Sequence, residues 1–132
     1  MRKLYIGIGV VVILAIGAFI LVQNNSNRKT QLATACDSAP SATSSATIVY
    51  SDSGFSPAVS AVTAGGTLII KNSSGSTVQF DSDPHPIHTD NPELNVGQVA
   101  SGEQKSVTVN KTGCFGYHNH LNPSETGKIL IK

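Results

Sequence analysis

The residues Ala61 to Gly75 read AVTAGGTLIIKNSSG. This segment holds two short runs of apolar and β-branched residues, Ala61 to Thr63 and Thr67 to Lys71, which favour extended strands. Residues that favour turns stand between the runs, at Ala64-Gly65-Gly66, and after them, from Asn72 to Gly75. The segment therefore predicts two strands, each followed by a turn.

The same pattern continues from Thr47 to Lys132 and predicts one all-β domain. Short apolar or alternating runs are separated by Gly, Pro, Asn and Ser, and no run has the period of a helix. About seven strands at this spacing are typical of an antiparallel β-sandwich or barrel. The other strands are expected near Thr47 to Tyr50, Thr77 to Phe80, Lys105 to Asn110, Cys114 to His118 and Lys128 to Lys132.

Length and charge limit the function classes. The 132 residues leave room for one small folded domain, and the formal net charge is +1. No basic stripe is present that could neutralise nucleic-acid phosphates, so a nucleic-acid partner is not expected.

The N-terminal segment predicts a membrane anchor. Leu4 to Val22 reads LYIGIGVVVILAIGAFILV, an uncharged run that as a helix would cover the roughly 30 Å of a bilayer core. Arg2 and Lys3 precede it, and the positive-inside rule then places the N-terminus in the cytoplasm and the later residues outside. We expect a single-pass protein of the cell membrane with an extracytoplasmic C-terminal domain.

A cleaved secretory signal is the competing interpretation. Ala33-Thr34-Ala35 resembles a cleavage site, and Cys36 behind it would be the lipidated residue of a lipoprotein. The apolar run is longer than the roughly 7 to 15 residues of a signal core, which favours the anchor. All three interpretations export the domain.

The chain thus divides into an anchor at residues 1–22, a linker at 23–46 and a folded domain at 47–132. The linker is rich in Ser, Thr, Ala and Asn and has too few large apolar residues to fold, so it is expected to be flexible. Cys36 and Cys114 both lie outside the membrane on this topology. Whether they form a disulfide stays open, because the sequence does not determine the distance between them.

All four histidines fall in two places. His85 and His88 lie in the proline-rich loop Asp81 to Gly97, and His118 and His120 lie in Tyr117-His118-Asn119-His120. Solvated loop histidines are the alternative, but such complete clustering favours a metal site, since imidazole binds Cu, Zn, Ni and Fe. Four acidic residues flank the first pair, either as hydrogen-bond partners of the imidazoles or as a solvated acidic loop: Asp81, Asp83, Asp90 and Glu93.

Five segments, in this order, carry a resemblance to a known family. They are Gly54 to Pro57, Val62 to Asn72, Pro84-His85, Gly113 to Tyr117, and Leu121-Asn122-Pro123 followed by Gly127. Together they make residues 47–132 resemble the plastocyanin-like cupredoxins. The resemblance implies a single Greek-key β-sandwich, copper binding and electron transfer.

The ligand pattern departs from that family. The resemblance implies a blue copper ion held by a first histidine, matched by His85, and by a cysteine, a histidine and a methionine in the C-terminal loop. These last three positions fall on Asn119, Asn122 and Glu125. Loss of the thiolate excludes a blue site. Cys114 does not replace it, since about 13 Å of extended strand separate it from His118.

Nitrogen and oxygen donors remain for a metal ion. His118 and His120 are two residues apart, so in extended backbone they project to one side, with Asn119 on the other. With His85 and His88 opposite them, the set fits a tetragonal, type-2-like Cu(II) ion. Zinc accepts the same ligands. Glu125, Asn119 and Asp90 are candidates for additional donors to the metal ion.

Two functions of different classes follow. The first is a membrane-anchored, extracytoplasmic copper-binding protein for copper handling or electron transfer, with a redox or copper-exchange protein as partner. The second is a metal-free interaction module that has kept the sandwich. Whether the chain is an enzyme is left open, although binding or electron transfer is favoured, since no nucleophile with a base and an orienting group is identifiable.

Overall fold

The computed structural model describes residues 35–132, so the predicted anchor and much of the predicted linker lie outside the described residues. Within 35–132, no helix has the length and apolar character needed to cross a bilayer. The elements are β1 (Thr43–Ser51), β2 (Gly54–Ser56), β3 (Val59–Asn72), β4 (Val78–Ser82), the 3₁₀ helix η1 (Pro92–Leu94), β5 (Gly97–Val99), β6 (Gln104–Val109), β7 (Gly113–Asn119) and β8 (Asn122–Ile131).

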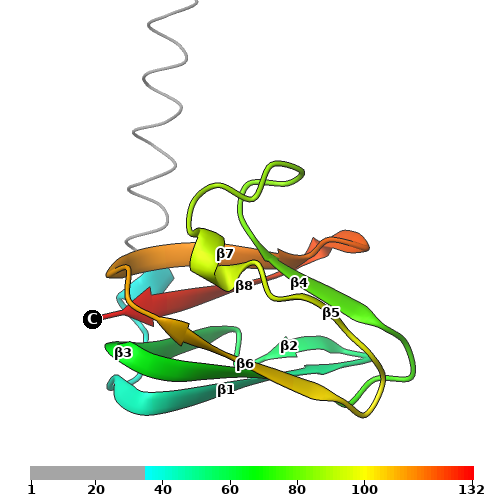
Figure 1. The fold of residues 1–132 in the computed structure, drawn as a ribbon, viewed down its shortest axis with the longest axis horizontal. Coiled ribbons are helices and arrows are strands. Elements are labelled where there is room, and N and C mark those ends of the chain that lie inside the picture. Colours follow the sequence, from blue (N-terminus) through cyan, green and yellow to red (C-terminus); the bar gives the residue numbers. More distant parts are fainter. Residues whose placement is uncertain (1–34) are drawn as a thin grey trace, which may run out of the picture. The chain divides into compact units, whose positions relative to one another are not determined.

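The strands form a two-layered β-sandwich (Figure 1). One continuous path of hydrogen-bonded strands runs β2-β1-β3-β8-β7-β4-β5, and β6 pairs with the second half of β3. In Figure 1 the layer with β4, β7 and β8 lies above the layer with β1, β3 and β6. The expected all-β sandwich is therefore confirmed.

The expectation of a purely antiparallel sheet is wrong at two pairings. β1 pairs with β3 in parallel, and β3 pairs with β8 in parallel, while the other pairings are antiparallel. Parallel neighbours need a long connection between them. Here that connection is not a helix: β2 lies between β1 and β3, and most of the domain lies between β3 and β8.

β3 is one strand where two were predicted. Val59 to Val62 pairs with β8, and the part from Gly66 to Lys71 pairs with β6. Between them Gly65 has a φ of +80°, and a Cβ on Gly66 would meet the carbonyl oxygens of Thr63 and Ser44. The two glycines therefore bend the strand so that it crosses from one layer to the other.

The first strand also starts earlier than expected. β1 begins at Thr43 rather than Thr47, because Thr43 pairs with Val62 and Ser45 with Thr67. The short strands β2 and β5 were not predicted, since three residues carry too little pattern. The last residues of the predicted linker thus belong to the sheet.

Alternating apolar side chains of both layers fill the core. The rings of Phe80 and Tyr117 stack with centroids 4.5 Å apart, and Phe55 packs edge-on against both. Burial of such rings is the main contribution to stability in a domain of this size. The fully buried side chains include Ile48, Val62, Leu68, Ile70, Val78, Leu94, Val99 and Ile129.

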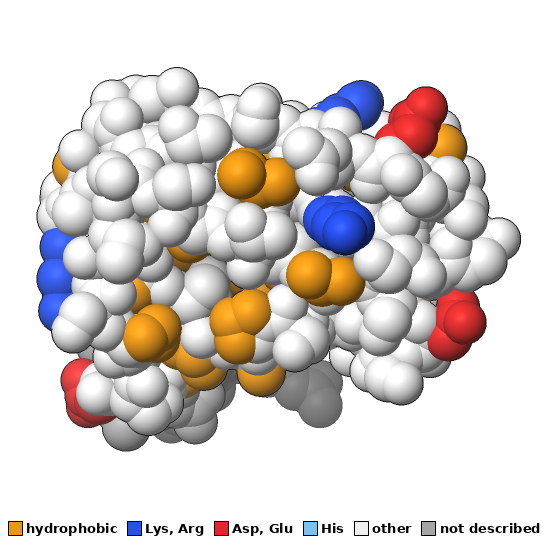
Figure 2. Space-filling view, turned by 90° about the horizontal axis from the view of Figure 1, so that it is seen from below, with side chains coloured by type: hydrophobic (Ala, Val, Ile, Leu, Met, Phe, Trp, Pro, Cys, Tyr) orange, Lys and Arg blue, Asp and Glu red, His pale blue; other side chains and the backbone are white. Residues whose placement is uncertain are grey.

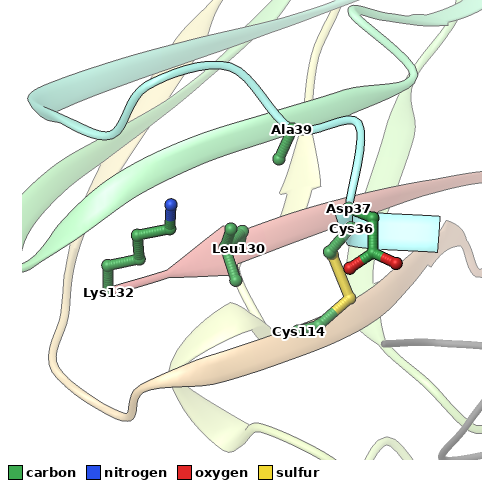
Figure 3. A pocket seen from close by; sticks show the side chains of 6 residues that line it. All are labelled: Cys36, Asp37, Ala39, Cys114, Leu130 and Lys132. Atoms are coloured by element: carbon green, nitrogen blue, oxygen red, sulfur yellow. A yellow bond between two sulfur atoms is a disulfide. The ribbon is translucent and has the colours of Figure 1, made fainter. Parts of the chain in front are cut away.

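The open question about the two cysteines is answered by a disulfide between Cys36 and Cys114, whose α-carbons lie 6.1 Å apart. A pocket beside it is lined by Asp37, Ala39, Leu130 and Lys132 (Figure 3). The bridge fixes Cys36 at the start of β7, while the histidines lie at the other end of that strand. A lipid thioether at Cys36 would need the sulfur that the disulfide uses.

Candidate metal centre

A compact loop after β4 presents the first two histidines. The carbonyl oxygen of Pro84 accepts hydrogen bonds from the amides of Ile87 (3.0 Å) and His88 (2.8 Å). The base of the loop is closed by the amide of Asp90, which donates to the carbonyl of Asp83 over 2.9 Å. His88 has a φ of +50°, and Asn95 Nδ2 donates to its carbonyl oxygen. The loop is thus held by its own hydrogen bonds rather than by sheet pairing.

The β7–β8 hairpin presents the other two. His118 is paired with Asp81 of β4 and with Thr126 of β8, so it lies inside the sheet. His120 follows β7 in the turn, and its amide donates to the carbonyl of Gln79 over 2.8 Å. Both rings face the loop after β4, as their spacing predicted.

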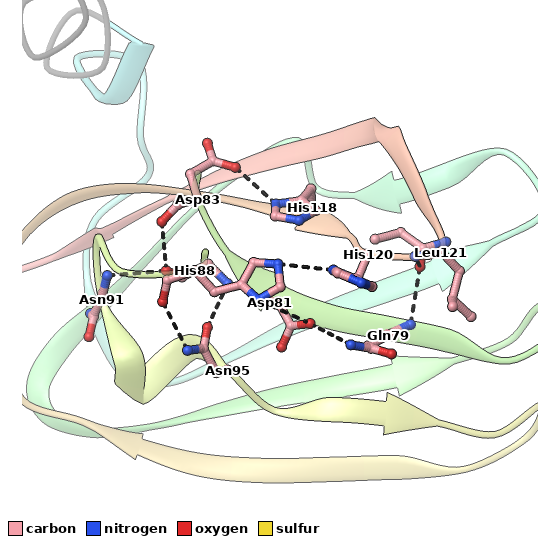
Figure 4. A network of polar contacts seen from close by, with 11 residues as sticks. Gln79, Asp81, Asp83, His88, Asn91, Asn95, His118, His120 and Leu121 are labelled. Atoms are coloured by element: carbon pink, nitrogen blue, oxygen red, sulfur yellow. Dashed lines mark hydrogen bonds and ion pairs between the residues drawn. The ribbon is translucent and has the colours of Figure 1, made fainter. Parts of the chain in front are cut away.

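The four imidazoles meet at one end of the sandwich, and Figure 4 shows three of them, those of His88, His118 and His120. One ligand nitrogen from each of His85, His88, His118 and His120 can be chosen so that all lie within 4.8 Å of one another. Nδ1 of His120 lies 3.0 Å from Nε2 of His88. The face seen in Figure 2, from the side of β1, β3 and β6, shows no histidine of the described chain. The predicted clustering is therefore found in the structure.

The four histidines differ in their exposure to solvent. His118 is 1 % exposed, His88 and His120 are intermediate, and His85 is open to solvent. One side of the cluster is thus built into the protein, and the other is accessible to an ion or a partner.

Two aspartates lie behind the rings. Oδ1 of Asp83 lies 3.0 Å from Nδ1 of His118, and Oδ2 of Asp83 lies 3.7 Å from Nζ of Lys128. Asp81 is 5 % exposed, its Oδ2 accepts a 2.8 Å hydrogen bond from Gln79 Nε2, and it lies 3.9 Å from Nδ1 of His88. Both carboxylates therefore approach imidazoles of the cluster.

The contact with Asp83 fixes the tautomer of His118. An ionised carboxylate only accepts hydrogen bonds, so Nδ1 must carry the proton and Nε2 keeps its lone pair. Nε2 is buried and has no hydrogen-bond partner. An unpaired buried acceptor is destabilising unless something binds it. The lone pair of His118 is therefore available to a cation at the cluster.

Burial also acts on His88. It lowers the pKa of that imidazole below its usual value, and the neighbouring imidazoles add to this effect, while the carboxylate of Asp81 opposes it. The lowered pKa favours the neutral ring, which is the form that binds metal.

The further donors expected from the sequence do not join the cluster. Asn119 Oδ1 accepts from the amides of Gln79 and Leu121, and its Nδ2 donates to Oε2 of Glu125 over 2.8 Å. Glu125 also accepts from the hydroxyl of Tyr50. Asn119 and Glu125, expected as further donors, therefore bind each other and Tyr50 in this structure instead of lying among the four imidazoles.

Asp90 and Glu93 have roles in the loop. The backbone carbonyl of Asp90 accepts a 2.6 Å hydrogen bond from Lys111 Nζ. Asp90 is not among the residues whose ligand atoms meet at the cluster. Glu93 accepts from the amides of Asn110 and Lys111, and these bonds lower the pKa of its carboxyl group. Asp90 as a ligand is therefore not supported.

Sequence reasoning missed the residues that support the aspartates. Gly116 leaves the space that Asp83 occupies, since a Cβ there would contact Oδ2 of Asp83. Its carbonyl also accepts from the amide of Asp83 over 3.0 Å. Gln79 and Lys128 hold the two carboxylates from the other side. No sequence pattern pointed to Gly116, which lies between Phe115 and Tyr117.

Comparisons with known proteins concern the fold. No protein-family model matches the sequence, and no curated protein is significantly similar to it. Among solved structures, a purple cupredoxin from Nitrosopumilus maritimus matches with a TM-score of 0.57 and 15 % identity, over 66 % of this chain and 99 % of that one. Amicyanin from Paracoccus versutus matches with a TM-score of 0.56 and 15 % identity, over 74 % of this chain and 89 % of the other.

A Cu(I) form of an amicyanin variant is also similar, with a TM-score of 0.53 and 14 % identity, over 70 % of this chain and 86 % of that one.

Proposed function

Because the described part of the chain has the cupredoxin fold, we propose that it binds one copper ion through His85, His88, His118 and His120. The site is not of the blue type. The ion is held by imidazole nitrogens at the exposed end of the sandwich, in a type-2-like Cu(II) centre.

The observation that carries this proposal is the buried, unpaired Nε2 of His118. With its proton held on Nδ1 by the carboxylate, His118 has a buried acceptor nitrogen without a partner, which is unfavourable for a histidine kept for packing alone. The hydrogen bond that Nδ1 of His118 donates to Asp83 leaves a lone pair on Nε2, in a cluster with three further imidazoles. A copper ion would satisfy that lone pair.

The thiolate of a blue site is missing from the donor set. In the described residues both cysteines are joined in the disulfide and neither is free. Four neutral imidazoles favour Cu(II) over the other divalent first-row metals, including zinc, by the general order of affinity. When bound, copper would supply a single-electron couple or be the cargo itself.

We further propose that the domain works outside the cytoplasm on a single-pass anchor, Leu4 to Val22. The disulfide supports this location, since such bonds persist in oxidising compartments. The role is copper handling or electron transfer, with a redox or copper-exchange protein as the partner that approaches the exposed His85.

Copper titration of the full-length chain in mild detergent tests the proposal. We expect one Cu(II) per chain, with nitrogen couplings from imidazoles in the electron paramagnetic resonance spectrum and without the intense thiolate absorption of blue copper. His118→Ala should lower the affinity at least about tenfold. Asn122→Ala is the matched control, because Asn122 is exposed and lies outside the cluster.

Two results would contradict the proposal. If the chain took up no copper, the metal-free interaction module would be the better description. If zinc bound stoichiometrically and displaced Cu(II), the metal would be zinc, since the same four nitrogens suit it.

A further inference from the structure

Asp81 and Asp83, which lie next to imidazoles of the cluster, differ from solvated surface acids in their burial and contacts. Asp83 touches the most buried imidazole, and Asp81 is itself 5 % exposed. Among residues 35–132, no lysine or arginine forms an ion pair with Asp81, whereas Asp83 has Lys128 at 3.7 Å. The side of the site that is closed to water therefore carries a net negative charge.

We propose that Asp83 and Asp81 make this site selective for divalent over monovalent copper, so that the chain holds and transfers Cu(II) rather than cycling between oxidation states. This inference rests on the proposed copper function and chooses between its two roles. Asp83 and Asp81 are positioning and specificity-determining residues, and they contact imidazoles rather than the ion.

Electrostatics gives the direction of this selectivity. The attraction between a fixed carboxylate and an ion is proportional to the charge of the ion, so it is twice as large for Cu(II) as for Cu(I) at the same position. Screening by water is limited behind the rings, because the side chain of Asp81 is only 6 % exposed and that of Asp83 only 19 %. The pair therefore stabilises the oxidised state more than the reduced state.

The hydrogen bond that His118 donates to Asp83 also favours Cu(II). A carboxylate that accepts the Nδ1 proton increases the basicity of the opposite nitrogen, and a more basic imidazole is a stronger ligand for a harder cation. Gln79 holds Asp81 by a 2.8 Å hydrogen bond, and Gly116 leaves room for Asp83. Both charges are therefore fixed in place by the fold.

Variants that remove a negative or a positive charge should shift the midpoint potential in opposite directions, and they test this selectivity. Asp83→Asn keeps the size of the side chain and an acceptor for His118 but removes the charge. Its Cu(II) affinity should fall about tenfold while its Cu(I) affinity changes much less. A tenfold change in that ratio raises the midpoint potential by about 59 mV for one electron. Asp81→Asn should shift it in the same direction.

Lys128→Gln is the opposite variant. It removes the positive charge next to Asp83, so the midpoint potential should fall, by less than Asp83→Asn raises it, because Lys128 is partly exposed and screened. A role of these residues in folding alone would not give shifts of opposite sign. Asp52→Asn is the control without effect, since its carboxylate accepts from the amide of Gly75 instead of facing an imidazole.

The measurements are chelator competition for each oxidation state and a redox titration of the copper-loaded, full-length chain. Nitrogen NMR of the metal-free protein is an independent readout, because it reports which nitrogen of His118 carries the proton. That proton should remain on Nδ1 in Asp83→Asn, since asparagine keeps an acceptor for it. Copper uptake with the same midpoint in wild type, Asp83→Asn and Lys128→Gln would overturn this inference alone. Absence of copper uptake by the wild type would overturn the proposed function as well.

Discussion

The hydroxyl of Tyr50 donates a 2.8 Å hydrogen bond to Oε2 of Glu125, and Asn119 Nδ2 donates to the same oxygen at the same distance. Two donors therefore converge on one carboxylate oxygen beside the buried face of β7. Burial of Tyr50 and its bond to Glu125 raise the pKa of that phenol. This polar group lies where the family resemblance placed copper ligands, yet its side chains bind one another.

The first prediction concerns Glu125→Gln. Its Cu(II) affinity should equal that of the wild type, because Glu125 is not in the cluster. The free energy of unfolding should fall by about 1 kcal/mol, since two charge-assisted hydrogen bonds become neutral ones at a partly exposed site. Urea unfolding and copper competition measure the two quantities. A loss of copper affinity as large as that of His118→Ala would restore Glu125 as a ligand.

The second prediction concerns pH and His88. The unfolded chain protonates this residue near its usual pKa of about 6.5, and the folded metal-free chain only at lower pH. Below about pH 6.5 the unfolded state thus binds more protons than the folded state. The contribution of His88 to the free energy of unfolding is therefore complete above that pH, and it is lost as the pH falls through the pKa of the folded state.

His88→Asn is the variant for that test, because asparagine tolerates the positive φ of this position. In urea unfolding of the metal-free proteins, the free energy should decrease less steeply below about pH 6.5 in the variant than in the wild type. Equal slopes would show that His88 is not the group responsible.

The third prediction concerns Gly116→Ala. The added methyl group would meet Oδ2 of Asp83 and Nζ of Lys128. Asp83 must then move from His118, which should weaken Cu(II) binding and destabilise the fold by about 1–3 kcal/mol. Gly75→Ala is the matched control, as a Cβ there meets nothing within 4 Å and its φ is negative. If Gly116→Ala bound copper like the wild type, Asp83 would not depend on this space.

The fourth prediction concerns the disulfide. Replacing both Cys36 and Cys114 by alanine opens a connection between residues 78 positions apart, and should reduce stability by about 2–4 kcal/mol. The copper spectrum should be unchanged, because the bridge and the histidines lie at opposite ends of β7. A changed spectrum in the folded double variant would mean that the bridge shapes the metal centre.

Local patterns predicted the parts of the molecule that depend on near neighbours. The strand rhythm and the two-residue spacing of His118 and His120 were sufficient for the sandwich and for the direction of those rings. The parallel pairings of β3 were not predictable, because they depend on how residues far apart in the chain align. The glycines at 65 and 66 look like a turn in the sequence and act as a bend in the fold.

The surroundings of the site were harder to predict for the same reason. That Asp83 would reach an imidazole depends on the closure of the loop against Gly116. That Asn119 and Glu125 would turn to Tyr50 depends on the hairpin, in which Asn119 pairs with Asn122. The family resemblance alone does not reveal the pairing of Asn119 with Asn122.

The tight turn between β7 and β8 bears on how the proposed metal ion would enter and leave. With His118 in the sheet and His120 in the turn that follows it, two donors stand ready before any ion arrives, so little conformational entropy remains to be lost on uptake. Exchange of the proposed ion would then begin at the accessible edge, where His85 is the most exposed of the four rings. The copper-exchange partner proposed above would therefore meet that one imidazole first, and it would take the ion without separating any strand.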